Sequence, residues 1–186
     1  LITDFAQYRE CLSDLLKSGD RHPEATALEI GAGSSPLVQL LSQQYAQVTC
    51  VDNSEAMLRA TRAAIKAWGL KNVDCRYADF LTIDPDAQVD LLVINMVLHH
   101  IASPSSFFEA ARPWMVPEGR LLVIDLCPHD QDWAREICGD QWLGFDPSEL
   151  MTWALNAGFR SDQTAYLGLK NGFQIQIHLF QPNIEL

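Results

Sequence analysis

The sequence predicts an α/β fold with a parallel sheet, folded as a single domain over residues 1–186. Three observations predict it. A length of 186 residues suits one compact domain with one core. Continuous apolar runs, typical of strands buried on both faces, alternate with stretches whose apolar residues recur every three or four positions, as in helices. The third is the order of these segments, strand then helix then strand, which is typical of β-α-β units with parallel strands.

Five apolar runs are predicted to form strands, and they cover residues 25–30, 47–51, 73–77, 89–95 and 120–126. Ser35 followed by Pro36 predicts a helix that begins directly after the glycines that follow the first strand. Ser54 is predicted to cap the next helix, which Gly69 ends.

The later helices are marked by prolines. One helix begins at Pro104 and is shortened by Pro113, ahead of a turn at residues 117–119. Another begins at Pro147. Two strand-like runs then flank Asn171 and Gly172, a pair that predicts an antiparallel hairpin at the end of the chain.

Composition excludes several classes of function. Thirteen basic and 24 acidic residues give a net charge of −11, which repels nucleic acid and anionic membranes. No apolar run approaches the length of a membrane span, and no signal peptide is recognisable, so we expect a cytoplasmic protein. The five cysteines contain no Cys-x-x-Cys pair, which indicates neither a zinc site nor a disulfide framework.

The best candidate for a binding site is the turn after the first strand. Gly31 and Gly33 allow the backbone to approach a ligand closely, and Asp52 follows Gly31 by 21 positions, at the end of the second strand. This spacing predicts a nucleoside pocket in which Asp52 accepts hydrogen bonds from ribose hydroxyls. Pro36 stands where a dinucleotide fingerprint needs its third glycine, and the acidic Glu29 suits a cationic ligand better than a pyrophosphate.

At these residues the sequence resembles the class I S-adenosylmethionine-dependent methyltransferases, and the resemblance covers nearly the whole chain. The first motif of that family is an acid followed by G-x-G-x-G. Glu29, Gly31 and Gly33 match it, whereas Ser35 replaces the third glycine. Asp52 matches the family's ribose-binding acid.

Two further segments match motifs of that family at the expected places in the sequence. Asp79 matches the family's adenine-binding acid, with Phe80 closing over the base, and residues 95–100 resemble its substrate-side motif. The resemblance implies a Rossmann-like three-layer sandwich whose seven-stranded, mostly parallel sheet has the order 3-2-1-4-5-7-6, with the last strand antiparallel. The implied cofactor is S-adenosyl-L-methionine, held by Glu29, Gly31, Ala32, Gly33, Asp52, Asn53, Met57, Asp79, Phe80 and Asn95.

The implied reaction is methyl transfer to an unidentified small molecule, for which no metal is required. If the acceptor has to lose a proton, His99, His100 or His129 is the candidate base. Residues 1–22, which have helical spacing, and residues 127–145 are expected to form a lid over the acceptor. A homodimer is left open.

Three alternatives stay open. His129 and Asp130, followed by residues 139–145, resemble methyltransferase domains that follow a winged-helix, arsenic-repressor-type DNA-binding domain, which implies such a domain upstream of Leu1. The second alternative to the enzyme is a non-catalytic module of a transcription regulator that senses S-adenosylmethionine or S-adenosylhomocysteine. A nicotinamide-dependent reductase is the third alternative, against which Pro36 argues.

Overall fold

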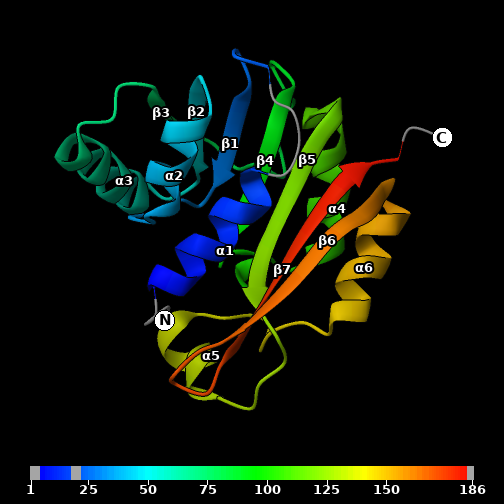
Figure 1. Ribbon diagram of the computed structural model, residues 1–186. Coiled ribbons are helices and arrows are strands. Elements are labelled where there is room, and N and C mark those ends of the chain that lie inside the picture. Colours follow the sequence, from blue (N-terminus) through cyan, green and yellow to red (C-terminus); the bar gives the residue numbers. More distant parts are fainter. Residues whose placement is uncertain (1–4, 18–21, 184–186) are drawn as a thin grey trace.

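The computed structural model describes residues 5–17 and 22–183, which form one seven-stranded sheet covered by helices on both faces (Figure 1). The strand order is β3-β2-β1-β4-β5-β7-β6, as predicted. Strand β7 runs antiparallel to both of its neighbours, and the other pairs are parallel. The strands are β1 (Thr26–Ile30), β2 (Gln47–Asp52), β3 (Val73–Tyr77), β4 (Val89–Asn95), β5 (Met115–Leu126), β6 (Phe159–Gly168) and β7 (Gln174–Pro182).

The helices form the two outer layers. One face of the sheet carries α1 (Phe5–Lys17), α2 (Leu37–Gln44) and α3 (Glu55–Trp68). The other face carries α4 (Pro104–Ala111) and α6 (Pro147–Asn156). Two short 3-10 helices, η1 (Leu98–His100) and η2 (Arg112–Trp114), and the helix α5 (Trp133–Cys138) complete the set. The predicted three-layer sandwich is therefore confirmed.

The helix ends follow the local chemistry of the sequence. The Ser54 hydroxyl accepts a hydrogen bond from the Met57 N–H at 3.4 Å, and Gly69 ends α3 with a left-handed φ of 66°. Before α2, the Ser35 hydroxyl accepts from the Leu37 N–H at 3.2 Å. Both helices thus follow the preceding strand after a short turn. Because β1 and β2 are parallel, the two short turns lie at the same edge of the sheet.

Strand β5 differs from the prediction. It begins at Met115 rather than at residue 120, and the expected turn at residues 117–119 is a bulge inside the strand. Val89 pairs with Met115 and Leu91 with Arg120, so three extra residues of β5 are accommodated between these two pairs. The strand continues through Pro117 and Gly119, and its residues from Gly119 to Leu126 are all buried.

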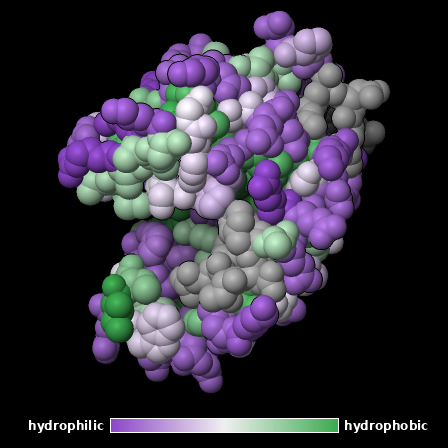
Figure 2. All heavy atoms as spheres, turned by 60° about the vertical axis from the view of Figure 1, so that its left-hand side comes forward, coloured by the Kyte–Doolittle hydropathy of each residue, from purple (hydrophilic) through white to green (hydrophobic). Residues whose placement is uncertain are grey.

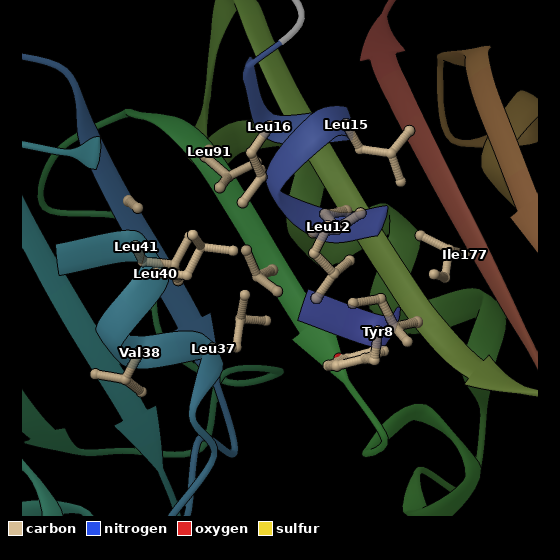
Figure 3. Close-up of a cluster of buried hydrophobic side chains, with 14 of the residues drawn as sticks. Tyr8, Leu12, Leu15, Leu16, Leu37, Val38, Leu40, Leu41, Leu91 and Ile177 are labelled. Carbon is tan, nitrogen blue, oxygen red and sulfur yellow. The ribbon is translucent and has the colours of Figure 1, made fainter. Parts of the chain in front are cut away.

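The N-terminal helix belongs to a packed layer. Tyr8, Leu12, Leu15 and Leu16 are at most 8% exposed, and Figure 3 shows α1 crossing β4 and β5 with these side chains turned toward the sheet. The lid role expected of residues 1–22 stays a prediction, and residues 1–4 and 18–21 lie outside the described residues. In the described part of the chain, no helix has the length and apolar character needed to cross a membrane.

Candidate functional site

A cavity of about 500 Å³ opens where β1, β2, β3 and β4 end. In Figure 2 the surface is deeply hollowed between an upper and a lower part of the molecule. The cavity lies at the point where the strand order changes direction between β1 and β4, where ligands bind in open α/β sheets. Its lining includes Gly31, Asp52, Asn53, Met57, Asp79, Phe80, Met96, Val97 and His100.

The turn after β1 requires glycine. Gly31 has a φ of 65°, and a Cβ atom added there would lie 2.6 Å from Cγ2 of Val97. Gly33 has a φ of 52°, and its Cβ would meet the Met57 side chain at 2.8 Å. The left-handed φ disfavours a side chain at both positions. At Gly31 the Cβ would also crowd Val97, whereas at Gly33 the end of the flexible Met57 side chain can move aside. The bare backbone of Gly31 lines the cavity. Such a turn suits a ligand that is held against the main chain.

Asp52 ends β2 beside this turn. Its Oδ1 accepts a hydrogen bond from the Ser54 N–H at 2.8 Å, and Oδ2 has no hydrogen-bond partner among the described residues. Partial burial raises the pKa of Asp52, an effect that the Ser54 hydrogen bond opposes. A fixed carboxylate with one free oxygen, next to a glycine turn, has the donor-accepting chemistry that a pair of ribose hydroxyls needs. The residues present therefore fit an adenosyl ligand.

Asp79 and Phe80 differ in their surroundings. Asp79 is exposed, and its Oδ1 accepts from the Leu81 N–H at 3.0 Å. Phe80 is only 5% exposed, with its ring 5.4 Å from that of Trp114 and 5.9 Å from that of Phe107. Both residues line the cavity, but most of the Phe80 ring belongs to the core.

Four of the predicted cofactor residues do not line the cavity: Glu29, Ala32, Gly33 and Asn95. Glu29 is fully buried, and neither carboxylate oxygen finds a hydrogen-bond partner within the described ranges. Burial raises the pKa of Glu29 to about 8. Asn95 accepts a hydrogen bond from the Tyr8 hydroxyl at 2.7 Å and donates to the Ser35 hydroxyl at 3.2 Å. Asn95 thus contacts the turn after β1 from inside the molecule, through Ser35.

The candidate bases gather at the ends of β4 and β5. The buried His99 ring shares a hydrogen bond of 2.6 Å between its Nδ1 and Oδ1 of Asp125, and Asp125 also accepts from the His99 N–H at 3.2 Å. Burial lowers the pKa of His99, but the hydrogen bond and charge of Asp125 outweigh it and the net shift is upward. His100 is exposed and lines the cavity. His129 packs edge-on against Phe173, and burial lowers its pKa.

Residues 127–145 dock on the turn that holds these histidines. The N–H groups of Gln141 and Trp142 donate to the His99 carbonyl at 3.0 and 3.1 Å, and the Trp142 ring donates to the Ile101 carbonyl at 3.0 Å. The neighbouring Asp140 is thereby brought against His99 and His100. Sequence reasoning did not select Asp140, because it lies 40 positions from His100 and no local motif connects them.

Comparison with known proteins identifies methyltransferases as relatives of this chain. Residues 28–123, just over half of the chain, match the family described as a methyltransferase domain. An uncharacterized methyltransferase of Staphylococcus carnosus is 26% identical over 136 residues, which are 72% of this chain and 60% of that protein. A ubiquinone biosynthesis O-methyltransferase of Stutzerimonas stutzeri is 26% identical over an alignment of 146 residues that covers 70% of this chain and 62% of that protein. The chain thus spans about three fifths of the length of these relatives.

Solved structures share the fold. One is the 1,6-didemethyltoxoflavin-N1-methyltransferase of Burkholderia thailandensis, solved with 1,6-didemethyltoxoflavin and S-adenosylhomocysteine bound. It superposes with a TM-score of 0.76 at 20% identity, over 97% of this chain and 80% of that one. At this level of identity the likeness shows a common architecture.

Proposed function

The chain belongs to the methyltransferase domain family, and on that basis we propose that it transfers the methyl group of S-adenosylmethionine to a small-molecule acceptor. The observation that carries the proposal is the cavity at the strand ends, in which the side-chain-free Gly31 and the partly free carboxylate of Asp52 lie together. The hydroxyl groups of a nucleoside can donate hydrogen bonds to the Asp52 carboxylate, and a slender, flexible tail can lie against the main chain at Gly31.

Each residue in the cavity has a defined task in this proposal. When bound, the cofactor supplies an electrophilic methyl group on a positively charged sulfur. Asp52 accepts hydrogen bonds from the ribose, and Asp79 accepts one from the adenine amino group. Gly31 lets the main chain approach the ligand. Burial raises the pKa of Glu29, behind the turn, to about 8, and in this proposal a positively charged ligand favours ionisation of that carboxyl group. The other proposed cofactor residues are Ala32, Gly33, Asn53, Met57, Phe80 and Asn95.

The acceptor side is proposed to lie toward His99, His100 and His129. An acceptor that is already nucleophilic needs only alignment with the methyl group and exclusion of water. A hydroxyl acceptor also needs a base. In this proposal His100, which lines the cavity, receives that proton directly, whereas His99 is hydrogen-bonded to Asp125.

Transfer of a labelled methyl group tests this function. The protein is incubated with S-adenosylmethionine labelled in its methyl group and with a small-molecule extract, and both the labelled product and S-adenosylhomocysteine are measured. We expect protein-dependent label in the small-molecule fraction and a loss of most of it in Asp52→Ala. Binding of the cofactor without any labelled product would contradict the catalytic part of the proposal.

A further inference from the structure

Three side chains that can ligate a metal meet at the ends of β4 and β5. His99, His100 and Asp140 each offer one ligand atom, and the three atoms lie within 4.8 Å of one another. Oδ1 of Asp140 is 3.7 Å from Nε2 of His99 and 3.6 Å from Nδ1 of His100. These separations are too long for hydrogen bonds, although each becomes an ion pair when its imidazole is protonated.

Asp140 is held in this position by contacts that do not use its carboxylate. The main-chain hydrogen bonds of Gln141 and Trp142 to the His99 carbonyl fix the backbone next to it. Its side chain is 2% exposed, and Oδ1 finds no hydrogen-bond partner within residues 5–17 and 22–183. A buried carboxylate oxygen without a hydrogen-bond partner lowers the stability of the folded state, because it has lost its hydrogen bonds to water and no protein hydrogen bond replaces them. With both imidazoles neutral, no positive group faces that oxygen, and a metal ion bound between the three side chains would supply one.

His99 is oriented as a metal ligand would be. Its Nδ1 lies 2.6 Å from Oδ1 of Asp125, a fully buried carboxylate that can only accept a hydrogen bond from that ring nitrogen. In the neutral ring this bond favours the tautomer in which Nε2 has a free lone pair, and Nε2 is the atom that faces Asp140. In metal sites, a ligating histidine commonly donates its other N–H to a carboxylate in this way.

We propose that His99, His100 and Asp140 form a binding site for a divalent transition-metal ion of the Zn²⁺ class, with Asp125 orienting His99 from behind. Two imidazoles and a carboxylate are ligands that such ions accept. Ligand atoms around tetrahedral Zn²⁺ lie about 3.4 Å apart, a few tenths of an ångström less than the two distances to Asp140. Three protein ligands leave a fourth position open, and His100 belongs both to this site and to the wall of the cavity. The metal site does not depend on the proposed reaction.

Binding of Zn²⁺ and Co²⁺ alone tests the site. Protein without an affinity tag is stripped with a chelator, and each ion is titrated by calorimetry. We expect one ion per chain, with an affinity that falls by about tenfold or more in His100→Ala and in Asp140→Asn. His22→Ala is the control, because His22 is an exposed histidine that pairs with a carboxylate, Asp90, far from the site. Its affinity should match that of the unchanged protein.

Two further measurements distinguish metal binding at this site from metal binding by other side chains. Bound Co²⁺ should show visible absorption without a thiolate charge-transfer band, which excludes the cysteines, and Zn²⁺ should raise the melting temperature of the unchanged protein more than that of Asp140→Asn. His100 is exposed, so His100→Ala decides the outcome even if Asp140→Asn fails to fold. The absence of saturable binding, or binding that His100→Ala leaves unchanged, would overturn the proposal.

Discussion

The Tyr8 hydroxyl donates a hydrogen bond of 2.7 Å to Oδ1 of Asn95, across 87 positions of the chain. Nδ2 of Asn95 donates in turn to the Ser35 hydroxyl, which accepts from the Leu37 N–H at the start of α2. The N-terminal helix, the end of β4 and the helix after the glycine turn are thus joined by one series of hydrogen bonds. Figure 3 shows Tyr8 among the apolar side chains of this layer.

Tyr8→Phe is expected to lower the free energy of unfolding by about 1–2 kcal/mol, because it keeps the buried ring but leaves the Asn95 oxygen without this donor. Urea unfolding followed by circular dichroism measures the change. Tyr166→Phe serves as the control, since Tyr166 is 47% exposed. Equal stabilities of the two variants would show that the Tyr8 hydrogen bond contributes little.

Glu29→Gln is expected to change how stability depends on pH. In the folded protein Glu29 keeps its proton until its pKa of about 8, whereas the unfolded chain releases it near 4.5. The folded state therefore binds more protons between these values, and the contribution of Glu29 is lost as pH rises through this window. The loss is on the order of a few kcal/mol at most.

Urea unfolding at several pH values between about 5 and 8 checks this prediction. The free energy of unfolding of Glu29→Gln should fall less steeply with pH than that of the unchanged protein. Parallel curves for the two proteins would mean that Glu29 is ionised in the folded state at neutral pH, and that its burial is compensated in another way.

Gly144→Ala is expected to destabilise the protein more than Gly139→Ala. Both glycines have left-handed backbones, with φ of 79° and 75°, so the conformational cost of a Cβ is similar. A Cβ at Gly144 would lie 2.1 Å from the Cys127 carbonyl oxygen, whereas at Gly139 it would meet nothing within 4 Å. We expect the two to differ by more than about 1 kcal/mol in thermal or urea unfolding. Similar losses would contradict the close approach of residues 127 and 144.

The buried strands could be predicted well from the sequence, because a strand covered on both faces leaves a continuous apolar run. The predicted bounds of β1, β2 and β4 differ from the observed ones by at most one residue. The start of β5 could not be predicted, since Pro117 and Gly119 signal a turn unless the partner strand is known to hold them in a bulge. Helix α5 was not predicted either; its six residues, Trp133–Cys138, are too few to show a clear apolar stripe.

The residues of the candidate site also differ in whether the sequence could predict them. Gly31 and Asp52 could be selected because a turn between strand and helix imposes their spacing. Asp140 could not, since its position depends on how residues 139–142 dock on the turn after β4. The metal site proposed above also departs from the expectation that no metal is required. That expectation rested on cysteine spacing and on the resemblance, and neither indicates that His99, His100 and Asp140 come together from distant segments.

Calorimetric titration with S-adenosylmethionine tests the central claim most directly, because it measures binding without knowledge of the acceptor. The unchanged protein should bind one molecule, and Asp52→Ala should bind it more weakly by about 1–3 kcal/mol while keeping the same circular dichroism spectrum. Asp84→Ala, at an exposed carboxylate that does not line the cavity, should bind like the unchanged protein. An unchanged dissociation constant in Asp52→Ala, or no binding by the unchanged protein, would contradict the placement of the cofactor beside Asp52.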